Sequence, residues 1–332
     1  MLNFFRSKNP LIFIFYPLIA FVFIFFLSNI SEFKTINSDT PLLLKLLINL
    51  ISGKYFNALF IFSSVFMFVL TGAAYNSLVQ SLKVVKSFQN MHGLLLLLFS
   101  GIIIRYINPL QSFLFLFFFI IVIISAISSY SKKTAVFSFF NAGLFLALSS
   151  FFLPDIIYFF PVIILGQLIF RTVNFREIAT SLIGLVIPYF ILVSVWFFIF
   201  SNFDIIYDIH KQLLIKTASF KPDINLIISG SVVFIIIILS FFDILSKYRN
   251  TESLIQDFYS FCFISGLISL VFFIFILRFD FNILSVFFVF AVVPVGVFFS
   301  DNSRPLFKEI VFDIFLLCVI LSQTGFFRYF LV

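Results

Sequence analysis

Long apolar runs recur along the whole chain, and they constrain its fold more than any other feature of the sequence. They fall at residues 11–27, 57–75, 92–104, 109–127, 134–153, 156–170, 178–200, 224–242, 258–277, 281–299 and 310–327. A helix needs about 17 to 25 residues to cross a hydrocarbon core of about 30 Å. A backbone in lipid must also satisfy its own hydrogen bonds, as a helix does. The runs therefore predict an all-α, polytopic transmembrane bundle of about eleven spans, in a single integral membrane domain over residues 1–332.

The composition agrees with this fold class. Hydrophobic residues make up 62% of the chain and charged residues 11%, whereas a soluble domain has about 45 to 50% apolar and about 25% charged residues. The formal net charge is +7, but the basic residues are scattered through short loops and do not form one patch. We therefore expect contact with membrane lipids and no nucleic-acid partner.

The loop charges also predict an orientation. With the N-terminus in the cytoplasm, the cytoplasmic side carries Arg6, Lys8, Lys83, Lys86, Lys132, Lys133, Arg171, Arg176, Lys247, Arg249, Arg304 and Lys308. The short outer connections and the tail then carry only Arg105, Arg278 and Arg328, in line with the excess of Lys and Arg on cytoplasmic loops. The run at 92–104 is the shortest of the set. If it does not cross, every later orientation inverts.

Two longer outer loops, 28–56 and 201–223, offer room for structure outside the bilayer. Each has apolar residues at helical spacing among polar ones, which predicts a helix lying along the membrane surface. They also hold the candidate catalytic residues Glu32, Asp39, Asp204 and Asp208. Carboxylates at the surface, with basic residues near, are suited to acid/base chemistry on a lipid-linked sugar. The alternative is that they are solvated loop charges.

Four arginines are candidate ligand-binding residues. Arg105 and Arg278 stand at predicted span ends on the outer side, where a guanidinium can bind phosphate through two donors or extend to lipid headgroups. Arg171 and Arg176, with Glu177 beside them, suit an anionic headgroup on the cytoplasmic side or act only as an orientation signal.

Other polar residues have structural interpretations. Gln167, in an apolar run, predicts hydrogen bonding between helices. The segment 76–90 has apolar residues at helical spacing and predicts a continuation of the second span. His92 and His210 fall on opposite faces, so we expect no metal site, and no nucleotide or cofactor motif is present.

Two resemblances add to these interpretations. The inner N-terminus, about eleven spans and an acidic first outer loop followed by a surface helix resemble the GT-C class of membrane glycosyltransferases and related glycan polymerases and ligases. Short motifs at 140–143, 153–154, 174–177 and 184–188 are similar to an uncharacterised family of inner-membrane proteins from Bacteroidota. The second resemblance implies a bacterial inner-membrane location and supplies no activity.

The leading hypothesis from the sequence is a protein of envelope assembly that handles a lipid-linked glycan intermediate at the outer leaflet. A non-catalytic subunit or scaffold with a protein partner is the alternative, and a transporter is a third. Ionisable residues within the runs are scarce, which supports the scaffold alternative and disfavours a transporter.

Overall fold

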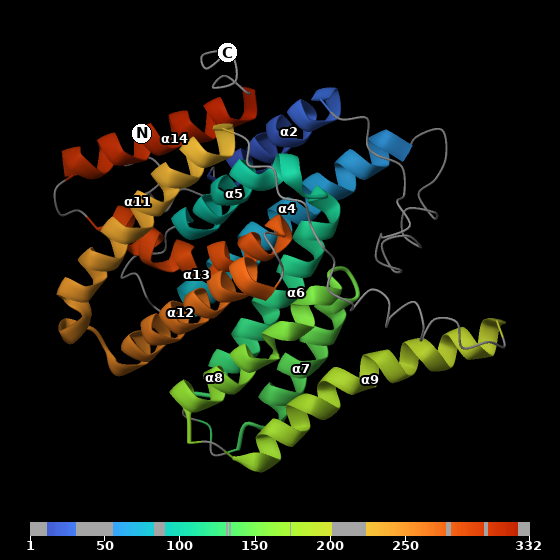
Figure 1. Cartoon of the computed structure of the whole chain (residues 1–332). Helices are drawn as coiled ribbons and strands as arrows, with labels where there is room; N and C mark the ends of the chain where they lie inside the picture. The colour runs from blue at the N-terminus through green and yellow to red at the C-terminus, as the bar shows by residue number, and fades with distance from the viewer. Residues whose placement is uncertain are drawn as a thin grey trace.

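The computed structural model of the chain describes residues 12–30, 56–82, 90–130, 132, 134–172, 174–200, 224–276, 280–301 and 305–324. Within these ranges the fold is all-α, with eleven α-helices and a few short 3₁₀ or π segments (Figure 1). Each α-helix overlaps one of the apolar runs. The predicted fold class is therefore confirmed for this part of the chain.

The helices are α2 (Ile12–Ile30), α4 (Phe56–Ser81), α5 (Met91–Ile103), α6 (Pro109–Ile127), α7 (Val136–Ser150), α8 (Phe160–Phe170), α9 (Phe175–Phe200), α11 (Ile224–Lys247), α12 (Ser253–Val271), α13 (Phe281–Ser300) and α14 (Pro305–Thr324). The predicted continuation of the second span is confirmed as far as Ser81, the last residue of α4. The two predicted surface helices lie outside the described residues.

Six of the described helices are long and apolar enough to cross a membrane. They are Ala58–Ser81, Pro109–Ile127, Phe175–Phe198, Asn225–Lys247, Ser253–Phe275 and Phe281–Ser300. Shorter apolar helices cover Ile14–Ile24, Met91–Tyr106, Val136–Ser150 and Pro154–Phe170. The chain is thus a multi-pass membrane protein, and the count of about eleven spans stays a prediction.

Successive helices run in alternating directions, so their ends gather into two groups. At one end the Tyr16 hydroxyl of α2 donates to the backbone oxygen of Asn90 before α5 (2.7 Å), and Asn76 late in α4 donates to Tyr16 (2.6 Å). At the other end Ser112 of α6 donates to Asn282 of α13 (2.8 Å). The end of α13 belongs to the first group, because Gly296 lies against His92 at the start of α5, and Lys247 of α11 contacts Asp301 there. We call the first group the Lys247 end and the second, where Arg105 follows α5, the Arg105 end.

Helix α5 lies at the centre of the bundle, and every one of its residues is buried. It packs against α4, α13 and α14. Its Phe99 ring contacts Phe288 at 5.3 Å and Phe315 at 5.1 Å between centroids. With 13 residues it is about 20 Å long, less than a hydrocarbon core. The run at 92–104 is therefore a core helix, and whether it crosses the whole membrane stays open.

Helices α7 and α9 make the closest crossing. A Cβ atom on Gly143 would collide with the backbone oxygen of Ser181, and one on Gly184 would collide with the backbone oxygen of Phe140. Only glycine at both positions lets the two backbones touch. Small residues have this use at many helix crossings in membranes.

The described basic residues are divided unevenly between the two ends. Those at the Lys247 end are Lys132, Arg171, Arg176, Lys247, Arg249 and Lys308. Arg105 follows α5 at the opposite end. The grouping agrees with the grouping predicted from the loops.

Candidate functional site

Most of the predicted site residues cannot be placed. Glu32, Asp39, Asp204, Asp208 and Arg278 lie outside the described residues. The catalytic role of the four carboxylates and the ligand-binding role of Arg278 stay predictions.

Arg105 lies in a 3₁₀ turn, Ile104–Tyr106, that follows the central helix. The residue is half-buried, and its Nε atom is buried with no hydrogen-bond partner. The neighbouring Tyr106 ring packs against Phe281, with 4.8 Å between centroids. A buried N–H without an acceptor is costly, so an acceptor there would be stabilising. The predicted contact with a phosphate remains a prediction.

Arg171 and Arg176 have different surroundings. Arg171 pairs with Glu177 (Nη1 to Oε1, 3.3 Å), and the two side chains are only 14% and 2% exposed. Glu177 also accepts from the backbone N–H of Ala135 (3.0 Å) and from Gln167 (3.3 Å). This cluster ties the α6–α7 loop, α8 and the start of α9 together. Arg176 is exposed beside it.

Gln167 confirms the predicted hydrogen bonding between helices. Its Nε2 donates to Glu177 of α9 and to the backbone oxygen of Asn174 (3.0 Å). Asn174 in turn accepts from the backbone N–H of Arg176 (3.0 Å), so it caps the N-terminus of α9. These contacts make the α8–α9 turn a structural element.

A second region has an open geometry. Helices α11 and α12 follow one another through a short connection at 248–252, yet each makes its main contacts with α13 instead of with its neighbour. The two helices diverge above α13 and leave a groove between them. We call this the chain groove.

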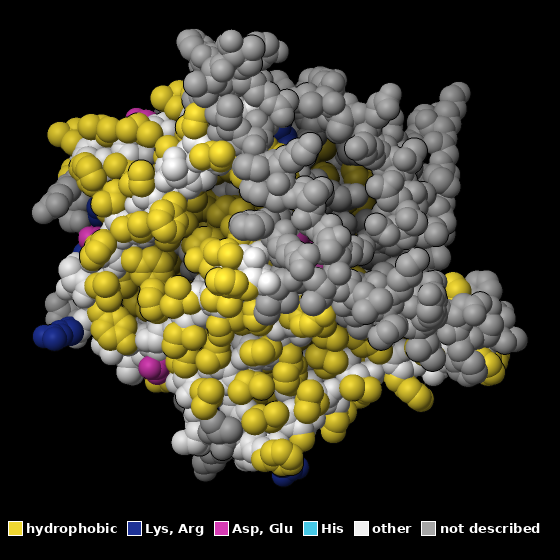
Figure 2. Space-filling view, viewed as in Figure 1, with side chains coloured by type: hydrophobic (Ala, Val, Ile, Leu, Met, Phe, Trp, Pro, Cys, Tyr) yellow, Lys and Arg dark blue, Asp and Glu magenta, His cyan; other side chains and the backbone are white. Residues whose placement is uncertain are grey.

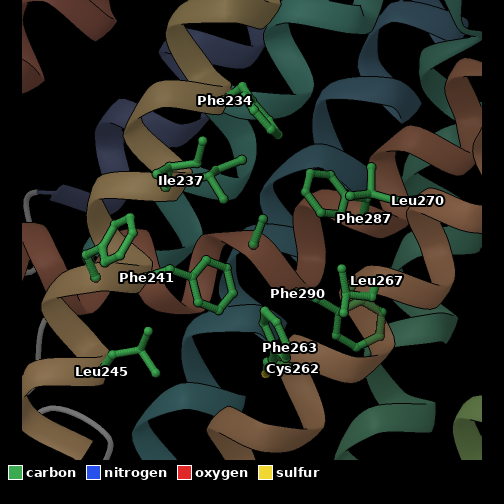
Figure 3. Close-up of a pocket in the computed structure, with 14 residues that line it drawn as sticks. Phe234, Ile237, Phe241, Leu245, Cys262, Phe263, Leu267, Leu270, Phe287 and Phe290 are labelled. Carbon is green, nitrogen blue, oxygen red and sulfur yellow. The ribbon is translucent and has the colours of Figure 1, made fainter.

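The chain groove has a volume of about 290 Å³ and a wholly apolar lining. It is lined by Phe234, Ile237, Ile238, Phe241, Phe242, Leu245, Cys262, Phe263, Gly266, Leu267, Leu270, Phe287, Phe290 and Ala291. Side chains of α11 form one wall and those of α12 the other, with α13 as the floor (Figure 3). Hydrophobic side chains also cover the surface around it, over α11 and α12 (Figure 2).

Wall and floor residues differ in exposure. Phe242 and Leu245 are exposed on the rim, whereas Cys262, Phe290 and Ala291 are buried. Near the Lys247 end, the rings of Phe241 and Phe263 meet across the groove at 5.2 Å and 69°. The groove thus opens sideways, between helices long and apolar enough to span a membrane.

Charged residues lie at the Lys247 end of α11 and α13. Lys247 donates to Asp243 (2.6 Å) and to Asp301 at the end of α13 (2.7 Å). Lys308 of α14 also donates to Asp301 (3.2 Å), and its ammonium lies 4.8 Å from the ring centroid of Phe298. Lys308 is only 2% exposed and Lys247 is 40% exposed. Of the two ammonium groups, that of Lys247 is within reach of a ligand.

Sequence reasoning missed both the groove and this network. Asp243 and Asp301 stand within or beside apolar runs, and carboxylates in such places are functional candidates by default. The two carboxylates could therefore have been recognised from the sequence. The groove could not, because it depends on how far α11 and α12 diverge in space. Within the described residues no three His, Cys, Asp or Glu side chains gather as a metal site would require.

Together, the apolar surface and the alternating helices define the class: a multi-pass, all-helical membrane protein. No protein family matches the sequence, and comparisons with curated proteins and with solved structures find no match. These comparisons therefore detect neither of the two resemblances inferred from the sequence.

Proposed function

We propose that this protein binds the hydrocarbon chain of a lipid-linked molecule in the chain groove, as part of envelope assembly in a bacterial inner membrane. The groove is the observation that supports this function. It is apolar throughout, open on its side and formed by helices of membrane-spanning character. A hydrocarbon chain is the occupant that such a lining accepts without a desolvation penalty.

Selectivity in such a site comes from shape. Lipid tails are as apolar as the helix surface, so burying a chain against protein gains little from the hydrophobic effect. The gain comes from many dispersion contacts with a surface that fits. Aromatic side chains of the walls, such as Phe241 and Phe263, and of the floor, such as Phe290, offer these contacts. We expect the groove to prefer one type of chain over bulk lipid.

The charge asymmetry supports an orientation for this function. The Lys247 end holds most of the described basic residues, and excess Lys and Arg mark cytoplasmic loops. The Lys247 end then faces the cytoplasm and the Arg105 end faces outward.

The lipid-linked molecule is a glycan intermediate in this proposal. Glu32, Asp39, Asp204 and Asp208 are the candidate acid/base residues at the outer leaflet, with Arg105 and Arg278 as candidate phosphate partners. This part of the proposal is supported by the layout of the chain alone, that is, by its many apolar runs and its acidic first outer loop.

The test is to measure the lipids that co-purify with the full chain in native-membrane discs, by mass spectrometry. Gly266→Leu fills the groove from α12, and Ala291→Leu fills it from α13. Gly230→Leu on α11 is the matched control, because no atom lies within 4 Å of a Cβ at Gly230. We expect both filling variants to lose a lipid that the wild type and the control retain. Equal lipid content in all four folded proteins would overturn the proposal.

A scaffold in a membrane complex is the second candidate, and one observation favours it. Beyond Pro188, none of the described side chains of α9 is buried, and Phe190, Ile191 and Phe198 are exposed. This half of α9 projects from the bundle (Figure 1). Photo-crosslinkers at 190 and 198 would trap a partner chain if α9 docks one. Crosslinks to lipid alone would rule out docking at these positions.

A further inference from the structure

The headgroup of the bound lipid has a place at the Lys247 end of the chain groove. On α11, Ile238, Phe242 and Leu245 form one edge of the groove, and Arg249 follows Leu245 by four residues. Residues three and four apart lie on the same helix face. Arg249 lies in the 3₁₀ turn Tyr248–Asn250 that directly follows α11, so it stands just beyond the apolar edge of the groove, and it is exposed.

Lys247 lies beside this position, where α11 meets the end of α13. Its ammonium group has three donors, and its two hydrogen bonds are those to Asp243 and Asp301. One N–H is left, on a side chain that is 40% exposed. The two carboxylates fix the ammonium group in place, so this third donor is already oriented.

The charged groups named around this position cancel, so binding of an anion here depends on the two donors and not on a net positive charge. Asp243 and Asp301 are balanced by Lys247 and by Lys308, which also donates to Asp301. Arg249 is then the added positive charge. Glu252, exposed in the same connection before α12, opposes it. Arg and Lys are the usual donors to phosphate, Arg through two parallel bonds and Lys as a point charge.

We propose that Lys247 and Arg249 hold the phosphate of a phosphate-bearing lipid whose chain lies in the chain groove. This inference rests on the proposed function. It places the phosphate in the leaflet at the Lys247 end, which is cytoplasmic in the proposed orientation, so Lys247 and Arg249 take the place of Arg105 and Arg278 as the phosphate partners of the lipid in the groove.

The experiment compares three probes on the purified full chain in nanodiscs: a long-chain isoprenoid monophosphate, the isoprenoid alcohol of the same chain, and inorganic phosphate. Arg249→Gln, Lys247→Met and Glu252→Gln are tested beside Gly266→Leu. Lys132→Gln is the control, because Lys132 lies at the same end and donates to Ser138 of α7 (3.1 Å). Arg249→Gln keeps the argument testable if Lys247→Met does not fold, since Arg249 takes no part in the ion pairs of this network.

We expect the monophosphate to bind about tenfold more weakly to Arg249→Gln and to Lys247→Met, the loss that removal of one charge-assisted hydrogen bond gives. Glu252→Gln strengthens its binding, and Lys132→Gln leaves it unchanged. The affinity for the alcohol should be the same in Arg249→Gln, Lys247→Met, Glu252→Gln and Lys132→Gln as in the wild type. Only Gly266→Leu should lose binding of the alcohol. Inorganic phosphate alone binds weakly, because it has no chain.

The outcomes separate the two proposals. If the alcohol binds in a manner that depends on Gly266 but the phosphate adds no affinity, the headgroup inference is overturned and the chain site stands. If the monophosphate binds equally well to Gly266→Leu, the chain site fails. If inorganic phosphate binds as tightly as the monophosphate, the site takes a free anion and the lipid headgroup inference is wrong.

Discussion

The α7–α9 crossing and the α11–α12 groove are two solutions to the placement of neighbouring helices, and glycine serves both. At the crossing, Gly143 and Gly184 face backbone oxygens, and there is no room for a Cβ atom. In the groove, a Cβ on Gly266 would lie 3.6 Å from Phe290 and 3.8 Å from Phe287, which are ordinary contact distances. One glycine permits close approach, and the other leaves space.

The difference extends to the polar residues around each region. Beside the crossing, where α7 and α9 begin, lies a buried ion pair of Arg171 with Glu177, whose side chains are 14% and 2% exposed. The groove ends beside Lys247, which is paired but remains 40% exposed. A buried ion pair holds a structure in one arrangement, whereas an exposed and oriented donor is free to meet a ligand. The crossing is therefore a structural core, and the groove is the candidate site.

The largest expected effect is at the crossing itself. In Gly143→Leu the new side chain collides with the backbone of α9 at Ser181, and overpacking of this kind costs about 3 kcal/mol or more. We expect the variant to aggregate or to unfold at far lower temperature, measured by size-exclusion chromatography after heating in detergent. Gly230→Leu on α11 is the control. Wild-type stability in Gly143→Leu would show that α7 and α9 do not touch.

The second effect tests the buried ion pair. Glu177→Ala removes the carboxylate that pairs with Arg171 and that accepts from the Ala135 N–H and from Gln167. Removal of one member of a buried pair costs about 3 to 5 kcal/mol. We expect a large loss of stability in detergent melts, against almost none for the control Asp313→Ala, because Asp313 is exposed on α14. Similar melts for the two variants would mean that the pair is not structural.

These two regions also show which features of the structure could be predicted from the sequence and which could not. The apolar runs predicted every described helix, because an apolar segment in lipid must satisfy its own backbone hydrogen bonds and does so as a helix. Gln167 was recognised because a polar side chain in an apolar run needs a partner. The burial of Glu177 could not be predicted, because its donors come from a loop and a helix that precede it in the chain. Gly143 and Gly266 look alike in sequence, and only their neighbours in space distinguish them.

A smaller effect tests whether the groove walls hold each other in place. The Phe241 and Phe263 rings form an edge-on contact between α11 and α12. Such pairs contribute about 0.5 to 1.5 kcal/mol beyond burial. A double-mutant cycle with Phe241→Ala and Phe263→Ala should give a coupling energy in this range. A coupling of zero would mean that the two walls move independently and that the groove has no fixed width.

The smallest expected effect separates the two regions most clearly, because alanine at Gly266 and alanine at Gly143 should change the stability of the protein in different directions. In Gly266→Ala the new methyl group meets Phe290 and Phe287 at ordinary contact distances, and alanine is favoured over glycine in a helix by up to about 1 kcal/mol. We expect unchanged or slightly higher stability in detergent melts. Gly143→Ala, with the same chemical change, should lower stability because its methyl group meets a backbone oxygen. Equal losses at the two positions would mean that the groove is closed, and the distinction between crossing and groove would no longer hold.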